Sequence, residues 1–465
     1  MSSYLKLNLA ALAGLLLLAA TPARAQDSGP LLDLLIKKGI VSDQEAEDLR
    51  ADLLKDFAVN SPAGKLDLST RVAKFALIGD VRARFQYDNE VSNNFAGVPG
   101  SGYNNDRSRY RYRIRFGPTV TLANNWQMGF RLETAAGSTS TNDDFGAAGS
   151  ANFAKDGNTA FVGQAWIEYA GNKQFGFDRV NFKVGKAAHP FFTPGINGFW
   201  IDSDINPEGL TEEVVKLDAF RPGWSLSLRA GQYLLSGNSR TTERLGGFLN
   251  NPSALFMGQA EFAKTYTYEN NPYGFRFAPA LVVFSGAEAN GMTLNQADSA
   301  TTTNYDNLTT VIVPIEHTFK VNNRPFAVYG TYGYNFGGAQ RANWLYSTSA
   351  TTLALTSAAG DPSSYNQMFN AGFRYGATRN PGDWQVTGEW RYVEPGAYTA
   401  ILLDSDFNAG RTNGTGFIAS LTYALTDAVN FTTTYFSARN IDKDSSSTVG
   451  FNRADVLQVD FSARF

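Results

Sequence analysis

Apolar and polar side chains alternate along most of the chain with a period of two residues. The clearest example spans 107–116, where an apolar series alternates with an arginine series. The apolar residues are Tyr110, Tyr112, Ile114 and Phe116, and the arginines are Arg107, Arg109, Arg111, Arg113 and Arg115. Successive side chains of a β-strand point to opposite faces, so this pattern predicts a strand with one apolar face and one guanidinium face. Closely spaced like charges repel strongly without water, so the guanidinium face is expected to face an aqueous space.

Similar segments recur to the end of the chain. The predicted strands lie near 75–87, 107–116, 126–136, 160–171, 178–187, 212–220, 223–232, 254–265, 273–284, 307–320, 324–336, 364–378, 382–394, 412–426, 427–440 and 453–465. Each is close to the ~10 residues that a tilted strand needs to cross a membrane. In the first of them, Arg82 and Arg84 alternate with Val81 and Phe85.

The connections between these segments alternate in length. Tight connections lie at 123–125, 270–272, 321–323, 379–382 and 426–427. Long connections, rich in Gly, Ser, Thr and Asn, lie at 89–106, 137–159, 188–211, 233–253, 285–306, 337–363 and 395–411. Outer-membrane barrels have short periplasmic turns and long extracellular loops. A propeller or a solenoid would instead repeat a single loop pattern.

The predicted fold class is therefore all-β transmembrane: an antiparallel outer-membrane β-barrel of about 16 strands over 65–465, with a short N-terminal helical segment. The last segment places Leu457, Val459, Phe461, Ala463 and Phe465 on one face. A terminal aromatic residue with this alternation resembles the recognition signal of bacterial outer-membrane proteins. Phe465 is therefore the candidate assembly signal.

The first 25 residues have the features of a secretory signal peptide. Lys6 precedes an apolar stretch centred on 15–18, and the stretch ends in Ala23-Arg24-Ala25. This order predicts cleavage after Ala25 and export. A retained membrane anchor is the alternative, but the apolar stretch is too short to span a bilayer comfortably.

A helical segment with a linker is predicted over 26–64. Gly39 lies where a first short helix would end, and Ser42 and Glu45 have capping-box spacing at the start of a second. We interpret the segment as a small helical hairpin in the periplasm. The alternative is an oligomerisation or cell-wall contact module, which the short apolar stripe supports less well.

The composition limits the possible chemistry. The absence of cysteine excludes disulfides and thiolate metal sites. The two histidines, His189 and His317, lie far apart in sequence and offer little for a zinc centre or a nucleophile relay. A net charge of −3 does not indicate nucleic-acid binding. No catalytic residue, metal or cofactor is therefore predicted.

Several stretches of the chain resemble a known family. They are 31–40 (LLDLLIKKGI), 79–85 (GDVRARF), the arginine series 107–115, 199–204 (FWIDSD) and 207–209 (PEG). They are similar to the porin-5-like family of Gram-negative bacteria. The resemblance covers most of the chain in layout, with its specific motifs in the first half, and it implies an outer-membrane channel. It implies little about the substrate.

The candidate site pairs a basic wall with an acidic loop. Arg82 and Arg84, with the five arginines of 107–115, are predicted to line the pore. The acidic loop, 188–211, follows the fifth predicted strand, where sixteen-stranded porins generally fold a loop inward to narrow the pore. Its candidate acidic residues are Asp202, Asp204 and Glu208.

Three interpretations of this constellation remain open. In the first, arginines that face acidic residues give an electric field across the constriction. In the second, an excess of guanidiniums makes the channel favour anions. In the third, the arginines and acids only pair with each other and brace the wall. Asp202-Ser203-Asp204 could also hold calcium, although two acids and a serine are a weak signal. The aromatic residues expected in the membrane girdles are Trp126, Tyr169, Tyr233, Tyr266, Tyr268, Tyr329 and Trp390; a minority of them could instead form a stacking path for sugars.

The function expected from sequence is passive diffusion of small polar solutes and ions through a water-filled channel, with a preference for anions as one of the open interpretations of the arginine series. The expected partners are outer-membrane lipid, the barrel-assembly machinery and two further copies of the chain in a homotrimer. One alternative is a scaffold barrel that sheathes an electron carrier or ties the envelope to the cell wall. Another is an outer-membrane hydrolase, which needs a nucleophile with a nearby base.

Overall fold

The structure, a computed structural model, describes 71–92, 103–135, 140–146, 159–236, 253–268, 271–285, 308–338, 365–441 and 453–465, with Lys38, Ser42, Glu45 and Ser69. The chain divides into two compact units, Met1–Thr70 and Arg71–Phe465. The predicted signal peptide, the linker and nearly all of the predicted helical segment lie outside the described residues. No helix among the described residues is long and apolar enough to cross a membrane.

In the first unit, Ser42 and Glu45 form the predicted capping box. The Ser42 hydroxyl accepts a hydrogen bond from the Glu45 backbone N–H (3.3 Å), and the Glu45 carboxylate accepts one from the Ser42 backbone N–H (2.9 Å). Two backbone donors at a helix start are thereby satisfied reciprocally. The Glu45 carboxylate accepts hydrogen bonds from both the backbone N–H and the hydroxyl of Ser42, and these two bonds, the backbone one first, lower the pKa of Glu45.

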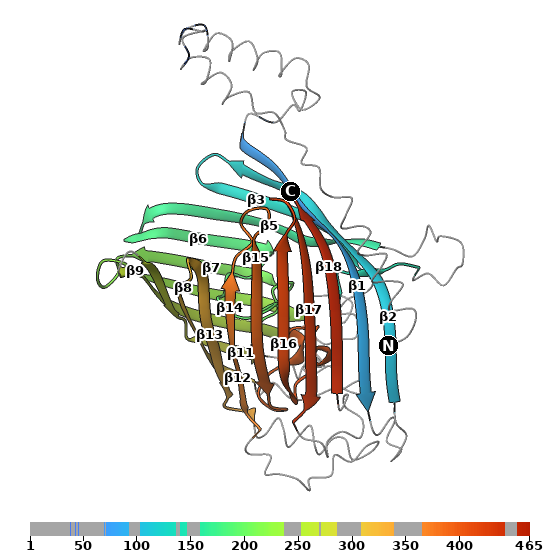
Figure 1. The fold of residues 1–465 in the computed structure, drawn as a ribbon. Helices are drawn as coiled ribbons and strands as arrows, with labels where there is room; N and C mark the ends of the chain where they lie inside the picture. The colour runs from blue at the N-terminus through green and yellow to red at the C-terminus, as the bar shows by residue number, and fades with distance from the viewer. Residues whose placement is uncertain are drawn as a thin grey trace, which may run out of the picture. The chain divides into compact units, whose positions relative to one another are not determined.

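The second unit is a single antiparallel sheet closed on itself (Figure 1). Its strands are β1 (Val72–Ser92), β2 (Tyr103–Leu122), β3 (Trp126–Ala135), β4 (Asp143–Asp144), β5 (Thr159–Gln174), β6 (Phe177–Lys186), β7 (Glu208–Leu217), β8 (Trp224–Ser236), β9 (Ser253–Tyr268), β10 (Asn271–Phe277), β11 (Ala280–Ser285), β12 (Thr309–Val321), β13 (Arg324–Asn335), β14 (Gln367–Gly376), β15 (Trp384–Val393), β16 (Gly414–Ala424), β17 (Val429–Asn440) and β18 (Arg453–Arg464).

Each strand pairs with its neighbours in sequence, and β1 closes the barrel by pairing with both β2 and β18. Within the described residues, β4 is a two-residue strand in a connection, and β10 and β11 are the two halves of one wall strand. The wall therefore has sixteen strands, which confirms the predicted fold class. Closure leaves no unpaired sheet edge, as a barrel in lipid requires.

Two features of the wall differ from the prediction. β1 and β2 have 21 and 20 residues and extend beyond the predicted 75–87 and 107–116 at both ends, and they pair with each other along nearly all of their length. The ninth wall strand is interrupted at Ala278-Pro279, because proline has no N–H to donate to the sheet. The Pro279 carbonyl still accepts a hydrogen bond from Ala260 N–H (3.0 Å), so the wall remains joined there.

Four of the predicted tight turns are found at one end of the barrel, whereas Asn270 of the fifth, 270–272, lies outside the described residues. Asn124 and Asn125 join β2 to β3 with φ of 59° and 68°, and Asn322 and Asn323 join β12 to β13 with φ of 50° and 60°. Two consecutive residues with positive φ form the hairpin turn that matches the twist of the strands, and asparagine tolerates this conformation well. We call this end the short-turn end; outer-membrane barrels place it in the periplasm.

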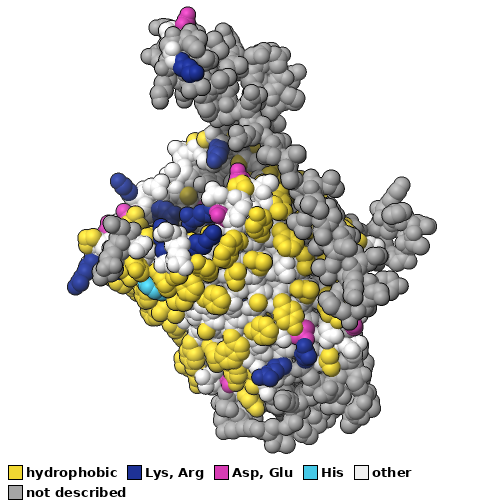
Figure 2. Space-filling model, in the orientation of Figure 1, with side chains coloured by type: hydrophobic (Ala, Val, Ile, Leu, Met, Phe, Trp, Pro, Cys, Tyr) yellow, Lys and Arg dark blue, Asp and Glu magenta, His cyan; other side chains and the backbone are white. Residues whose placement is uncertain are grey.

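The outer face of the wall is apolar (Figure 2). Tyr110, Ile114 and Phe116 of β2 are exposed outward, while Arg111 and Arg113 between them are buried on the inner face. The alternation read from the sequence therefore assigns the two faces correctly.

Part of the predicted aromatic girdle is wrong. Trp126, Tyr266 and Trp390 are exposed on the outer face, as expected. Tyr233 and Tyr329 are buried inside the barrel, where their hydroxyls contact Thr211 (3.0 Å) and Glu389 (3.2 Å). The hydroxyl of a buried tyrosine needs a polar partner, and the lumen supplies one to each.

Candidate functional site: the channel constriction

Seven guanidiniums form a basic strip on the inner faces of β1 and β2. We call this strip the arginine wall; it consists of Arg82, Arg84, Arg107, Arg109, Arg111, Arg113 and Arg115. Six of them pair with aspartates of β1 and β18, the strand that closes the barrel. The pairs are Arg113 and Arg115 with Asp80 (3.0 and 2.7 Å), Arg107 and Arg109 with Asp88 (3.4 and 2.9 Å), and Arg82 and Arg84 with Asp460 (3.9 and 2.7 Å).

The connection between β3 and β5 supplies the partner of the seventh arginine. Its strand β4 pairs with β2 at Arg111 and Tyr112. Asp144 of β4 accepts a hydrogen bond from Arg111 Nε (2.7 Å), and Gln86 accepts one from Arg111 Nη1 (3.1 Å). All seven guanidiniums therefore lie within 4.0 Å of a carboxylate.

The connection between β6 and β7 folds into the barrel; we call residues 187–207 the first inward loop. Pro190 and Pro194 cannot donate to a sheet ladder, and Gly195 and Gly198 have φ of +118° and +85°, so the segment leaves the sheet. Its apolar side chains, Phe191, Phe199, Trp200 and Ile201, are buried against inner-wall residues of β8, β9, β11, β12, β14 and β15. This loop matches the predicted 188–211 except at its end.

A second connection also folds inward. We call residues 394–413, between β15 and β16, the second inward loop. Ala397 and Tyr398 are fully buried in the same apolar core as Trp200 of the first inward loop. Asp202 N–H donates to the Leu402 carbonyl (2.9 Å), so the two loops are joined by backbone as well as by packing.

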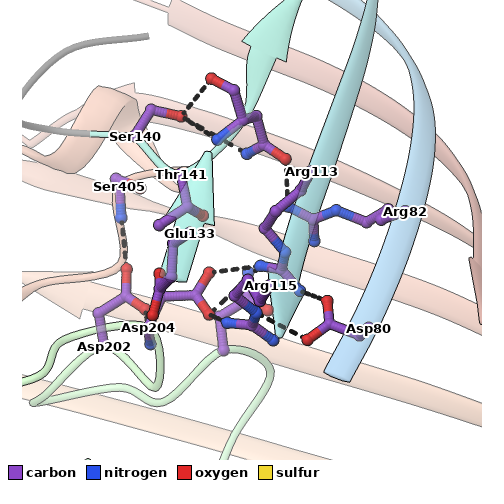
Figure 3. Close-up of polar contacts among 12 residues, drawn as sticks. Asp80, Arg82, Arg113, Arg115, Glu133, Ser140, Thr141, Asp202, Asp204 and Ser405 are labelled. Atoms are coloured by element: carbon purple, nitrogen blue, oxygen red, sulfur yellow. Dashed lines mark hydrogen bonds and ion pairs between the residues drawn. The ribbon is translucent and has the colours of Figure 1, made fainter. Parts of the chain in front are cut away.

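Asp204 connects the first inward loop to the arginine wall (Figure 3). Its two carboxylate oxygens accept hydrogen bonds from Arg113 (3.1 Å) and Arg115 (2.9 Å). Burial by itself would raise the pKa of Asp204, but Arg113 and Arg115 outweigh it and hold the pKa below its usual range. The carboxylate is therefore ionised, and it places a negative charge opposite the wall.

Asp202 points toward the second inward loop and not toward the arginines. Its carboxylate accepts hydrogen bonds from the backbone N–H groups of Ser405 (3.3 Å) and Asp204 (2.9 Å). Burial, and then the negative charge of Asp404, raise the pKa of Asp202 to about 8. The two aspartates of this short stretch thus have opposite protonation behaviour at neutral pH.

Two sequence-based interpretations of the acidic loop do not hold. Glu208 begins β7 and is exposed, and its carboxylate pairs with Lys186 (3.1 Å). It therefore lies at the start of a strand and not on the constriction loop. The calcium alternative at Asp202-Ser203-Asp204 loses its basis because the Asp204 oxygens are occupied by guanidiniums.

Beside this contact of Asp204, a cavity of about 830 Å³ lies between the arginine wall and the inward loops. On the wall side it is lined by Arg82, Arg107, Arg109 and Arg111, with Gln86 and Asp88. On the loop side it is lined by Asn197, Asp202, Asp204, Asp404, Ser405 and Asp406. A second cavity of about 540 Å³ at the short-turn end is lined mainly by polar side chains, among them Gln127, Glu168 and Asn181.

The sequence reasoning missed the residues that hold the inward loops. Glu389 and Arg391 of β15 are buried on the inner face and contact each other (2.7 Å), and Arg391 also pairs with Asp404 of the second inward loop (2.8 Å). Inward charged residues alternate on several strands, so nothing in the local pattern of β15 distinguishes this pair. Only the position of the loops reveals its role.

Comparison with known proteins gives a family and a set of similar folds. The chain matches the sequence model of a family described as "putative porin" over residues 69–313 and 320–465. No curated protein sequence matches it.

Comparison with solved structures finds, among others, three bacterial proteins. OprB of Pseudomonas putida, in a high-pH structure, is 12% identical with a TM-score of 0.48, over 84% of this chain and 94% of that one. OmpF of Salmonella typhi, in complex with daunomycin, is 13% identical with a TM-score of 0.42, over 86% and 100%. The outer-membrane channel DcaP of Acinetobacter baumannii is 14% identical with a TM-score of 0.41, over 86% and 99%. On the match to the family model, the chain belongs to this porin family and is an outer-membrane β-barrel channel.

Proposed function

We propose that the protein lets small polar solutes diffuse passively through the cavity between the arginine wall and the two inward loops. The observation that carries this proposal is the 830 Å³ cavity itself, which has guanidiniums on one side and loop carboxylates on the other. Opposed charges on the two sides of the cavity produce a field across the channel, and this field orients a polar solute without binding it tightly.

The pairing of the arginines argues for a weak ion preference. Each guanidinium of the arginine wall lies within 4.0 Å of a carboxylate, so the wall is not a bare positive strip. The loop side adds the carboxylates of Asp204, Asp404 and Asp406. We therefore infer a nearly balanced lumen, in which the anion preference expected from the arginine series alone is small.

Conductance and reversal potential test this proposal. Purified protein in a planar bilayer should give discrete conductance steps and a reversal potential near zero in a salt gradient. Asp204→Asn should shift the reversal potential toward anions, because Arg113 and Arg115 would then share only Asp80. Asp178→Asn is the matched control: it also removes a carboxylate from an ion pair, with Lys216 (3.7 Å), but neither residue lines the cavity, so the potential should stay close to wild type.

Two results would contradict the proposal. A protein that folds but leaves the bilayer silent is not a diffusion channel. An equal shift in Asp204→Asn and Asp178→Asn would show that the charge of Asp204 at the arginine wall does not set the ion preference.

The hydrolase alternative gains no support from the two histidines. His189 lies half-buried in the first inward loop, where desolvation lowers the pKa of its imidazole to about 4. His317 lies on β12 beside the rings of Tyr273 and Phe319. A general base needs a pKa near the working pH, and the lowered pKa of His189 does not meet this requirement.

The homotrimer expected from sequence is part of this proposal. The exposed apolar residues of the outer face, such as Phe130 and Phe182, can contact either lipid or another copy of the chain. Cross-linking of the protein in native membranes would distinguish a trimer from a monomer.

A further inference from the structure

We propose that Arg391 is the positioning residue that clamps both inward loops to the barrel wall and thereby sets the width of the channel. The statement that the clamp sets the channel width rests on the proposed function. The clamp itself can be tested without any measurement of transport. Four groups of contacts carry the inference.

Arg391 bonds to both loops at once. Its side chain is fully buried on β15. Nη1 donates to the Asp404 carboxylate of the second inward loop (2.8 Å). Nη2 donates to the backbone carbonyls of Ile196 and Gly198 in the first inward loop, the latter at 3.3 Å. Because the guanidinium is planar with donors in a fixed fork, it can hold these two segments in one orientation.

Glu389 fixes the orientation of the clamp. Its carboxylate accepts a hydrogen bond from Arg391 Nε (2.7 Å) and another from the Ile196 backbone N–H (2.7 Å). Asn370 (2.9 Å) and Tyr329 (3.2 Å) of the neighbouring strands donate to the same carboxylate. The anchor is therefore part of the rigid wall and not of the loops.

The loop backbone is shaped to receive this anchor. Gly195 has φ of +118°, and a Cβ at this position would lie 2.9 Å from the Glu389 carboxylate oxygens. Only glycine allows the chain to approach so closely in this conformation. The contact is therefore a built feature of the first inward loop.

Each loop also contributes an aromatic ring to the clamp. Phe199 of the first inward loop lies 5.8 Å from the Arg391 guanidinium carbon, and Phe407 of the second lies 5.4 Å from it. Both distances are within the range of a cation–π contact. Packing and polar contacts thus converge on a single side chain from both loops.

The clamp lies directly behind the loop side of the cavity. Asp404 pairs with Arg391 and also lines the cavity, and Asn197, which lies between the two carbonyls that Arg391 contacts, lines it too. Asn197 Nδ2 donates to the Asp404 carboxylate (3.4 Å), so the loops are linked at this position. If the anchor is lost, these lining residues are free to leave the wall, and the constriction changes.

A cysteine-labelling experiment tests the clamp. The chain has no cysteine, so Ile201→Cys introduces a single thiol at a buried position of the first inward loop. In the otherwise wild-type protein, folded in detergent or vesicles, a maleimide should label it slowly. Arg391→Met should accelerate labelling about a hundredfold or more, because removing one partner leaves the buried carboxylates of Glu389 and Asp404 uncompensated. Arg391→Lys should give an intermediate rate, because one ammonium cannot make all the contacts of the fork.

Arg374→Met is the matched control. It also removes an inner-wall arginine from an ion pair, with Glu316 of the wall (3.1 Å), while leaving the clamp contacts in place. With Ile201→Cys present, its labelling rate should equal that of Ile201→Cys alone. If Arg391→Met prevents barrel assembly, Asp404→Asn, which keeps the pair between Arg391 and Glu389, should still accelerate labelling.

Single-channel recording then connects the clamp to channel width. Arg391→Met should give larger and noisier conductance steps than the wild type or Arg374→Met. An unchanged labelling rate in Arg391→Met would contradict the proposal that Arg391 clamps the loops. If Arg391→Met does not assemble, an unchanged rate in Asp404→Asn would contradict it instead. Faster labelling with unchanged conductance would overturn its role in channel width. A silent wild-type protein would contradict the proposed function, and the labelling result would still decide the clamp.

Discussion

At the scale of single residues, the charged side chains of the lumen are balanced by pairing. The carboxyl groups of Asp202 and Asp204 have different partners. Asp204 has two guanidinium partners, whereas the neighbours of Asp202 are two backbone N–H groups and the carboxylate of Asp404. Two aspartates separated by one residue therefore have different charges at neutral pH. The sequence contains both carboxyl groups but not the environment that separates them.

The raised pKa of Asp202 predicts a pH response. Burial and then Asp404 raise it to about 8, well above the ~3.9 of an unfolded aspartate. The folded protein binds the extra proton between these values, so the contribution of Asp202 to stability falls as pH rises through this window. Above about pH 8 the ionised Asp202 should repel Asp404, and the contact between the loops should loosen.

Current noise measured between about pH 6 and about pH 9 checks this response, because the window ends at the raised pKa of Asp202. Noise should increase with pH in the wild type and in Glu208→Gln, which changes only an exposed acid. Asp202→Asn should remove most of the pH dependence, since the amide does not titrate. The same pH response in Asp202→Asn would disprove this assignment.

At the scale of elements, the sequence predicts strands well because their signal is local. Alternation identifies the face of every second residue, and Asn-Asn pairs mark two hairpin turns. The extra length of β1 and β2 could not be predicted, because it depends on their pairing along the inner face, as between Asp88 and Arg109 (2.9 Å). The small strand β4 exists only where β2 offers it an edge.

Close approach of two strands makes one glycine of β2 sensitive to substitution. A Cβ on Gly117 would lie 1.8 Å from the Phe130 carbonyl oxygen of β3, which is a backbone atom and cannot rotate away as a side chain could. Gly117→Ala should therefore lower the free energy of unfolding by about 1–3 kcal/mol, the range for overpacking. Urea unfolding in detergent measures the change.

Gly258→Ala provides the control for this substitution. Gly258 is also a strand glycine, in β9, but a Cβ there would have no atom within 4 Å. It should leave stability nearly unchanged. Equal losses in the two variants would mean that glycine flexibility, and not the close approach to Phe130, explains the effect.

At the scale of the whole molecule, the last residue completes the closure of the barrel. Phe465 N–H donates to the Gly79 carbonyl (3.1 Å), and Gly79 N–H donates to the Phe465 carbonyl (3.0 Å). The first and last strands of the wall thus meet at the chain terminus. The role of Phe465 as an assembly signal stays a prediction.

A substitution at Phe465 separates closure from recognition. Phe465→Ala keeps both backbone bonds with Gly79 but removes the terminal ring. If the ring is the signal, the amount of folded barrel in the outer membrane should fall, while barrels that do fold should unfold at the same temperature as wild type. Phe461→Ala removes another ring from the same strand, which contacts Phe431, and should not reduce the folded amount comparably. Equal yields in the two variants would count against the signal.

The sequence by itself determined the class of molecule, the number of wall strands, the alternation of short and long connections and the row of arginines on one face. All of these follow from local periodicity, because a strand in lipid must alternate its side chains and pair its backbone with its neighbours.

Only the tertiary structure decided which carboxylate each arginine meets and which loops enter the lumen. The partners of the arginine wall come from β1, β4, β18 and the inward loops, and the clamp at Arg391 meets Ile196 and Asp404 from separate parts of the chain. Closure of the sheet brings these distant segments together, and their packing depends on shape and charge that no local pattern records.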